Sequence, residues 1–309
     1  MSSEKRKKKK NKWPKIVGIA ILLFILAGGA FAYNVWHSLN KSVTSMYTDL
    51  DRNSEKRTNE LELTKQDPFS VLLLGVDERD GDSGRSDSMI VLTVNPELKS
   101  VKMLSIPRDT RTEIVGHGTT DKINHAYAFG GINMSMDTVE HFLDIPIDYF
   151  LEINMDGFKD IVDAVGGVNV QNNLDFTYDN VHFAKGTIKL NGEEALKYSR
   201  MRYEDPNGDF GRQERQRQII QAVIKEGANI SSLANYGDIL DALSKNIKTN
   251  LAFDNMIDIQ KNYRDASANV EQMTIKGQGT KMNGIYYYIV SEEEQQKVQT
   301  QLKDHLSMK

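Results

Sequence analysis

The chain has 309 residues, of which 39% are hydrophobic and 27% charged, as is ordinary for a folded globular protein. It contains no cysteine, which excludes disulfides, thiolate metal sites and a cysteine nucleophile. Residues 1–15 carry a net charge of +7, so the rest of the chain carries −11, because the total is −4. Such an acidic body argues against a general nucleic-acid-binding protein, which needs a positive surface.

The basic segment at residues 1–15 is followed by an uncharged, apolar segment at 16–36. A run of roughly 20 such residues is long enough to cross a bilayer as a helix, and lysines before it predict a cytoplasmic N-terminus. We therefore expect a single-pass type II protein of the cell membrane, with its body outside the cell. The alternative is a cleaved signal peptide, because Ala30-Phe31-Ala32 has the form of a cleavage site. The uncharged run continues past that site to Asn40, which favours a retained anchor.

Residues 37–67 are polar with alternating charges, and this pattern predicts a stalk between the anchor and a domain at 68–309. Within that domain, short apolar runs predict strands. The expected strands are Phe69–Val76, Met89–Val94, Val101–Ile106, Tyr149–Asn154, Val168–Val170, and a final pair formed by Val270–Ile275 and Ile285–Val290.

Segments with helical periodicity alternate with these strands. They are Ser135–Leu143, Gly157–Val165, Gly192–Tyr198, Asp209–Lys225, Tyr236–Lys245, Asn255–Tyr263 and Glu292–His305. Alternating strands and helices predict an α/β (α+β) domain with a central sheet and flanking helices in three layers.

The arginines are clustered. Of thirteen in the chain, nine lie in two windows, at residues 79–111 and 200–217. A solvated surface is the simplest explanation, but lysine is the commoner residue there, whereas the forked guanidinium of arginine matches phosphate oxygens. The clustering therefore predicts a site for a phosphate or another oxyanion.

The first window surrounds the ends of the first three expected strands. If these strands form a meander, one sheet edge collects two aspartates and several arginines: Asp77, Arg79, Arg85, Asp87, Arg108, Asp109 and Arg111. Asp77 and Asp87, at the two ends of one loop, indicate a divalent cation shared with a diphosphate, since Mg²⁺ prefers carboxylate and phosphate oxygens. The alternative is that Asp77 and Asp87 simply pair with Arg79 and Arg85.

The second window combines an expected extended segment with the start of a helix. Arg200 and Arg202 would project to the same side of an extended chain. Asp209 is expected at the N-cap or in the first turn, and Arg212 and Gln216 lie four residues apart on one helical face. A helix N-terminus also favours anions.

The remaining polar residues near the two windows are less clearly assigned. Arg215 and Arg217 are expected to face away from the site, at the surface. Lys122 is a further candidate phosphate contact, and His125 fits a structural role as well as a functional one.

Four sequence blocks together resemble the LytR–CpsA–Psr family of cell-wall glycopolymer transferases, over the stretch Leu72–Ile220. The blocks are Gly75-Val-Asp77 with Arg85-Ser-Asp-Ser88; Ser105-Ile-Pro-Arg-Asp109; Lys122-Ile-Asn-His125; and Arg200-Met-Arg202 with Gly208-Asp209 and Arg212…Arg215-Gln216.

The resemblance implies a mixed central sheet flanked by helices and a hydrophobic pocket for a polyprenyl tail. The diphosphate would lie at the pocket mouth with Mg²⁺ or Mn²⁺ held by Asp77 and Asp87. The residues that match the family's phosphate contacts are Arg85, Arg108, Arg200, Arg202 and Gln216, with Asp209 and Arg212 beside them. Arg79 and Lys122 are further candidate contacts from the residue pattern itself, and Arg85, Arg108 and Asp209 are the candidate catalytic residues.

The implied reaction passes an anionic glycopolymer, such as wall teichoic acid, from polyprenyl diphosphate to a sugar hydroxyl of peptidoglycan and releases polyprenyl phosphate. Asp209, Asp109 and an arginine all remain candidates for the group that removes the acceptor proton. Two other functions stay open: a hydrolase that cleaves lipid diphosphates with the same site, and a membrane-tethered regulator or wall-binding module without catalysis.

Overall fold

The computed structural model describes residues 40–50, 52, 54–77, 84, 86–229 and 243–308. Its centre is a six-stranded mixed sheet in the order β11-β6-β1-β2-β3-β12. The strands are β1 (Phe69–Val76), β2 (Ser86–Asn95), β3 (Ser100–Ile106), β6 (Tyr149–Ile153), β11 (Ile247–Thr249) and β12 (Val270–Thr274). The expected meander is confirmed, because β1, β2 and β3 pair antiparallel in sequence order, whereas β6 and β12 join in parallel.

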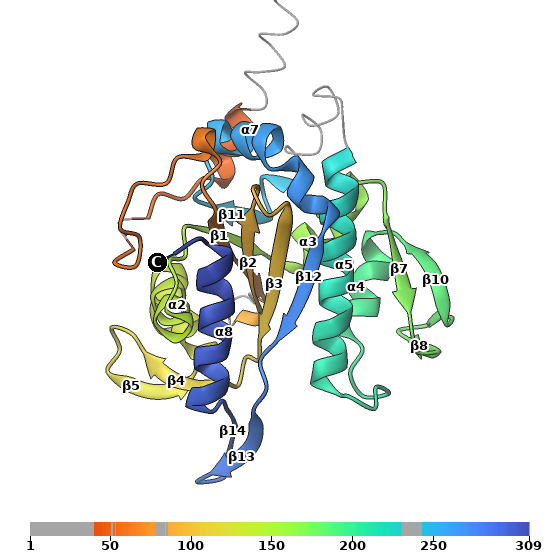
Figure 1. The fold of residues 1–309 in the computed structure, drawn as a ribbon. Helices are drawn as coiled ribbons and strands as arrows, with labels where there is room; N and C mark the ends of the chain where they lie inside the picture. The colour runs from red at the N-terminus through yellow and green to blue at the C-terminus, as the bar shows by residue number, and fades with distance from the viewer. Residues whose placement is uncertain are drawn as a thin grey trace, which may run out of the picture.

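Helices cover both faces of this sheet (Figure 1). Alternate side chains of a strand point to opposite faces, so Leu72 and Leu74 pack toward α2 (His125–Leu143) and α8 (Glu292–His305). On the other face, Phe69 and Val71 belong to a core that includes part of α5 (Asp209–Asn229) and α7 (Phe253–Asn262).

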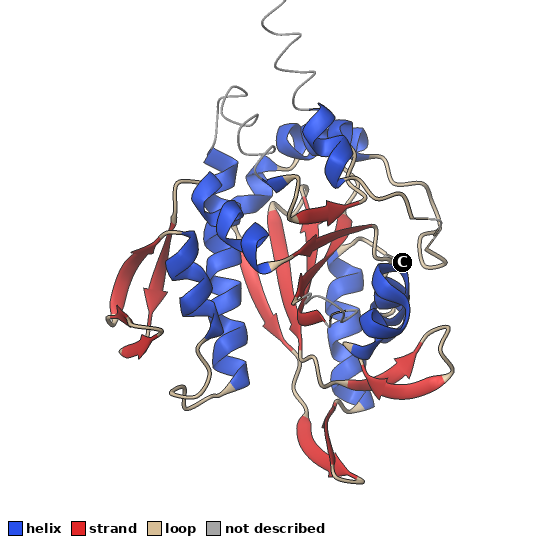
Figure 2. Ribbon diagram, turned by 180° about the vertical axis from the view of Figure 1, so that it is seen from behind, coloured by secondary structure: helices blue, strands red, loops and turns tan. Residues whose placement is uncertain are grey.

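A small module packs against α5, and its strands lie on the outer side of that helix, away from the sheet (Figure 1 and Figure 2). It contains α3 (Met155–Ala164), β7 (Val168–Asn172), β8 (Phe176–Tyr178), β9 (Val181–Phe183), β10 (Gly186–Leu190) and α4 (Gly192–Arg200). Its core includes Ile219 of α5 together with Phe176, Phe183 and Tyr198. The first half of α5 is thus enclosed between the sheet and this module.

Two short hairpins complete the fold. They are β4 (Arg111–Ile114) with β5 (Thr119–Lys122), and β13 (Gln278–Met282) with β14 (Ile285–Ile289). The expected pairing of Val270–Ile275 with Ile285–Val290 is therefore wrong. The first of these segments is β12, which pairs with β3, and the second pairs with β13.

Two helix predictions also need correction. The helix expected from Ser135 is preceded by a shorter helical segment that begins at His125, and a kink at Gly130-Gly131, whose backbone angles are not helical, separates the two parts of α2. Most of the expected helix Tyr236–Lys245 lies outside the described residues.

The segment expected to be a stalk is packed against the domain from residue 40 onward. Residues 40–46 are helical, and Val43 and Met46 are buried with Ile247 and Phe253. Arg52 donates hydrogen bonds to Asp137 and Glu140 of α2, so ionic contacts reinforce this attachment.

No helix within the described ranges is both long and apolar enough to cross a membrane. The expected basic tail at 1–15 and anchor at 16–36 lie outside those ranges.

Candidate active site

A cavity of about 380 Å³ lies between the sheet and helices α3, α4 and α5. Its inner walls are apolar, and the side chains that form them come from five elements. The side chains that form these walls are Leu73, Ile90, Met155, Phe158, Leu196 and Ile220. Burial of apolar surface is favourable in proportion to its area, so this space suits an extended hydrocarbon.

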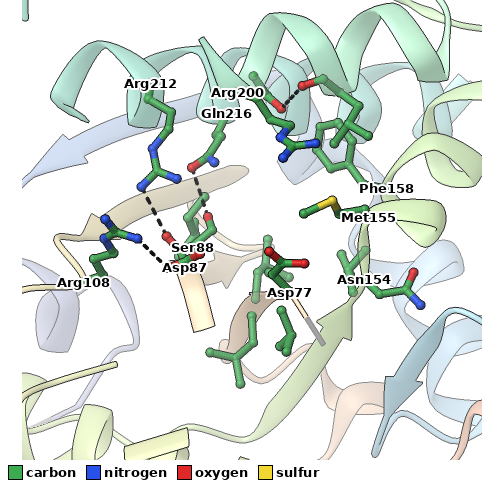
Figure 3. A pocket seen from close by; sticks show the side chains of 18 of the residues that line it. Asp77, Asp87, Ser88, Arg108, Asn154, Met155, Phe158, Arg200, Arg212 and Gln216 are labelled. Carbon is green, nitrogen blue, oxygen red and sulfur yellow. Dashed lines mark hydrogen bonds and ion pairs between the residues drawn. The ribbon is translucent and has the colours of Figure 1, made fainter. Parts of the chain in front are cut away.

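The mouth of the cavity carries two aspartates, and a β-bulge explains how they meet. Gly75 lies opposite Ser88 and Val76 opposite Ser86, so Asp87 is the extra residue of β2. A bulge leaves its extra residue unpaired and re-aims its side chain. Asp77, directly after β1, and Asp87 consequently both line the cavity (Figure 3).

Arg108 follows β3 and closes one side of the mouth. Its Nη1 donates a hydrogen bond of 2.5 Å to Oδ1 of Asp87. Burial alone would lower the pKa of Arg108, but this hydrogen bond and the charges of Asp87, Asp209 and Asp109 raise it above its usual value. Asp87 is therefore paired with Arg108; the alternative partners Arg79 and Arg85 lie outside the described residues.

The first turns of α5 supply the next side of the mouth. Nε of Arg212 donates to Asp209 at 2.9 Å, and its Nη2 lies 3.4 Å from the backbone carbonyl of Asp87. One turn later, Gln216 accepts a hydrogen bond of 3.0 Å from Ser88. The i, i+4 relation between Arg212 and Gln216 thus places both on the cavity wall, whereas Asp209 orients Arg212 from outside that wall (Figure 3).

Arg200 and Arg202 complete the mouth. The expected extended geometry is wrong for Arg200, which is the last residue of α4, but both side chains still line the cavity. The guanidinium of Arg202 lies 4.7 Å from the ring of Tyr203, which is 88% exposed. Within the described part of the chain, neither arginine has a carboxylate at ion-pair distance, so both can receive an anionic ligand.

Arg215 holds the segment between these two arginines and α5. The prediction of a surface position is wrong, because only 5% of Arg215 is exposed. Its guanidinium donates to the backbone carbonyls of Tyr198 and Met201 and to the carboxylate of Asp205. Arg215 thereby fixes the end of α4, and hence the positions of Arg200 and Arg202.

Arg217 was also expected at the surface and is instead 6% exposed. It donates hydrogen bonds to Ser105 and Gln272 and lines a second cavity, of about 340 Å³. Burial lowers the pKa of Arg217. Arg217 does not line the first cavity, which agrees with the prediction from its position on the helix that it faces away from the site.

Lys122 and His125 lie outside the cavity wall. The ammonium of Lys122 is 2.6 Å from Asp109, and Nδ1 of His125 is 2.8 Å from Asp121. Asp109 lies 3.8 Å from Arg108, so Lys122 acts on the mouth through Asp109 and Arg108.

The donor set fits a hard cation that shares its ligands with a substrate. Within the described ranges, no group of three or more His, Cys, Asp or Glu side chains could hold a metal ion by itself. Asp77 and Asp87 line one mouth, and Mg²⁺ commonly takes one or two carboxylates and completes its shell with phosphate and water oxygens. The two carboxylates therefore suit Mg²⁺ bound together with a diphosphate.

The sequence reasoning missed the protein groups that give the cavity its shape. Met155 and Phe158 belong to α3, whose start is fixed by the side chain of Asn154 accepting a hydrogen bond from Gly157 N. Tyr178 comes from the β8–β9 hairpin. The apolar face of α3 was visible in the sequence, but nothing local showed that it faces a cavity rather than a closed core.

Comparison with known proteins finds relatives along almost the whole chain. The model of the LytR_cpsA_psr family matches residues 33–304. The chain is 52% identical over 307 residues to the polyisoprenyl-teichoic acid–peptidoglycan teichoic acid transferase TagU of Bacillus licheniformis, covering 99% of this chain and 100% of that protein.

Two solved structures are also similar. The crystal structure of Bacillus subtilis TagU is 51% identical with a TM-score of 0.65, covering 79% of this chain and 98% of that chain. The structure of the LytR-CPS2A-psr family protein TagT with bound octaprenyl pyrophosphate lipid is 33% identical with a TM-score of 0.68, covering 84% of this chain and 100% of that chain.

Proposed function

This chain belongs to the LytR–CpsA–Psr family, and from that premise we propose that it transfers wall teichoic acid or a similar anionic glycopolymer from a polyprenyl-diphosphate carrier to peptidoglycan. The observation that carries this proposal is the cavity, which joins an apolar interior to a mouth lined by Arg108, Arg200, Arg202 and Arg212. This combination matches a ligand with a hydrocarbon tail and a diphosphate head.

The arrangement assigns a place to each part of the donor. The polyprenyl tail lies against Phe158, Leu196 and Ile220, and the diphosphate lies at the mouth. Arg200 and Arg202, which have no carboxylate partner within the described residues, donate to the phosphate oxygens. Charge-assisted hydrogen bonds of this kind are shorter and stronger than neutral ones.

The transfer forms one phosphorus–oxygen bond and breaks another. A sugar hydroxyl of peptidoglycan attacks the phosphorus attached to the glycopolymer and gives up its proton to a base, and the bond to the bridging oxygen breaks. Polyprenyl phosphate leaves with the charge that develops on that oxygen. Preorganised donors such as Arg108 and Arg212 stabilise this charge.

The proposal includes a metal ion and a membrane anchor. Asp77 and Asp87 would hold Mg²⁺ or Mn²⁺, which supplies Lewis-acid stabilisation of the diphosphate oxygens. Residues 16–36 would anchor the chain with residues 1–15 in the cytoplasm and the domain outside, so that the cavity can receive a donor that resides in the membrane.

The test uses the purified full-length chain with a radiolabelled lipid-linked teichoic acid donor, with and without peptidoglycan glycan strands. We expect label to move to the glycan and polyprenyl phosphate to appear only when the acceptor is present. Equal release of polyprenyl phosphate without acceptor would identify a hydrolase. Neither product, while donor still binds, would indicate a non-catalytic module.

A parallel reaction in excess chelator tests the metal. Activity should disappear and return with Mg²⁺, and Asp77→Asn and Asp87→Asn should each weaken this dependence without unfolding the domain. Full transfer in chelator would overturn the metal site while leaving the transfer reaction itself intact.

A further inference from the structure

The β13–β14 hairpin extends from the body at the end of the sheet where β3 and β12 finish (Figure 1). Its turn is Asn283-Gly284, and both residues have positive φ, 51° and 83°. A two-residue Asn-Gly turn with this geometry matches the twist of the two strands. The hairpin is thus held in a defined shape and can present its side chains without ordering them first.

The hairpin is fastened directly to the loop that follows the candidate active site. The backbone N–H of Tyr288 donates to the carbonyl of Asp109 at 2.8 Å, and Thr110 forms an isolated β-bridge with Tyr288. Asp109 and Thr110 come immediately after Arg108 of the mouth. A ligand that lies on the hairpin therefore lies at the margin of the site.

Aromatic rings form a row on this hairpin and the start of α5. We call Phe210, Tyr286 and Tyr288 the aromatic strip. Phe210 and Tyr288 have ring centroids 5.6 Å apart. A Cβ on Gly279 would lie 2.6 Å from the hydroxyl oxygen of Tyr286, and one on Gly277 would lie 2.7 Å from the Tyr288 ring, so glycines leave room for both rings to lie against the strand.

The strip is partly exposed and is mixed with polar groups. Phe210 is 47% exposed and Tyr286 is 42% exposed, whereas Tyr288 is buried. All residues of β13 are exposed, and Lys281, directly opposite Tyr286, shares its face of the hairpin. An exposed aromatic patch rimmed by polar residues is typical of an interaction site.

The charge of this region differs from that of the rest of the domain. From Gln272 to Ser291 there is no Asp or Glu, and the charged side chains are Lys276 and Lys281, although the chain after residue 15 carries a net −11. A neutral or anionic partner is therefore favoured here. Lysine is depleted at protein–protein interfaces, and a face that carries the Lys281 ammonium and the Tyr286 hydroxyl is not the continuous apolar face that membrane insertion requires.

We propose that the aromatic strip, together with the exposed side of β13, binds the glycan strand that accepts the transferred polymer. This inference rests on the proposed function, since it concerns the acceptor of that reaction. The apolar faces of sugar rings pack on Tyr286 and Phe210, while their hydroxyl groups bond to Lys281, which lies directly opposite Tyr286 on the same face of the hairpin. The attachment at Asp109 then places one sugar of the strand beside the mouth.

The experiment measures transfer by the full-length chain in detergent while glycan-strand and lipid-donor concentrations are varied separately. Tyr286→Ala and Phe210→Ala should each raise the KM for the glycan about fivefold or more, as expected for a lost aromatic contact, and leave the KM for the donor unchanged. The matched control is Tyr47→Ala, because Tyr47 is also 42% exposed but bridges to β11 at the opposite edge of the sheet. Tyr47→Ala should change neither constant.

Direct binding of glycan strands without donor, measured by calorimetry, separates this inference from the transfer reaction. If the wild type binds glycan and the two variants bind it several-fold more weakly, the strip is supported even when no transfer is seen. Unchanged glycan KM and affinity in both variants, with urea midpoints equal to the wild type, would overturn it. Weaker binding to anionic phospholipid vesicles, or loss of a dimer in sedimentation, with glycan affinity intact would assign the strip to a membrane or to a second copy and would also overturn it.

Discussion

The substitution Arg215→Met tests whether a buried arginine that does not line the cavity fixes the positions of residues at the cavity mouth. In the wild type, Nε of Arg215 donates to the carbonyl of Tyr198 at 3.0 Å, and its Nη2 donates to the carbonyl of Met201. Its Nη1 lies 2.5 Å from Asp205, and both side chains of this ion pair are 6% exposed. Methionine fills much of the same space but leaves two carbonyls and one carboxylate without their donor.

The expected loss follows from these contacts. Removing one partner of a buried ion pair costs about 3–5 kcal/mol, because the other charge stays buried and unpaired. The two carbonyls add to this unless water reaches them. We therefore expect the free energy of unfolding to fall by about 3–5 kcal/mol, and Asp205→Asn to cost at least about 1.5 kcal/mol less in the Arg215→Met background than alone.

Urea unfolding of the four proteins in this cycle measures the coupling, and transfer kinetics measure its effect on the site. Because Arg215 contacts the chain beside Arg202, Arg215→Met should also raise the KM for the lipid donor. Arg215→Lys keeps the charge but places its three donors on one nitrogen, which cannot reach all three acceptors as the forked guanidinium does, so it should recover only part of the loss. A change in unfolding free energy below about 1 kcal/mol, which is typical of an ordinary substitution, would refute this account of Arg215.

Three further predictions test separate parts of the structure. Arg200→Ala should lower kcat/KM for the donor by about 10- to 100-fold, since a hydrogen bond to a charged group contributes roughly 1.5–3 kcal/mol; Lys122→Ala, whose ammonium is held by Asp109, should have a smaller effect in the same assay. Gly211→Ala would gain about 1 kcal/mol of helix propensity, but its Cβ would lie 1.9 Å from Asp205, so urea unfolding should show a net loss of stability. Burial lowers the pKa of His305 from 6.5 to about 4, so the unfolded state binds more protons between these values and stability should fall by roughly 3 kcal/mol as pH drops through this window. His305→Gln should lack this slope in pH-dependent urea titrations.

Local patterns predicted the part of the fold that depends on neighbouring segments. The apolar runs at 69–76, 89–94 and 101–106, with short connections between them, lead to the antiparallel meander seen in β1, β2 and β3. The meander brings Asp77, Asp87 and Arg108 to one edge, so the proximity of these three residues was predictable from the sequence.

Pairings between distant segments were not predictable in the same way. β12 pairs with β3 across a separation of about 170 residues, and nothing in the sequence of Val270–Thr274 identifies β3 as its partner. The next apolar run along the chain, Ile285–Val290, was the simpler partner to expect, although the Asn283-Gly284 turn indicates a hairpin with the residues just before it. The bulge at Asp87 depends on the register of β1 and β2, which sequence spacing did not reveal either.

The arginines show most clearly why helical periodicity is not enough to separate site from surface. Periodicity correctly placed Arg212 and Gln216 on one face of α5 and Arg215 and Arg217 on others, but a face turned away from the site is exposed only if nothing packs against it. Here α5 is enclosed by the sheet on one side and by the module containing Phe176 on the other.

The tertiary contacts of each arginine in this segment, rather than its residue type, therefore determine whether it stabilises the fold or lines the cavity. Arg215 is neutralised by Asp205 and bonded to backbone carbonyls, so its hydrogen-bonding capacity is used within the fold. Arg212 has both roles, because its Nε donates a hydrogen bond to Asp209 while the side chain still lines the cavity. Arg200 lines the same cavity and, within the described residues, has no carboxylate partner. A cation in a partly apolar cavity is stabilised by an anion that enters it, so Arg200 is more available to an anionic ligand than Arg215, whose donors are all used within the fold.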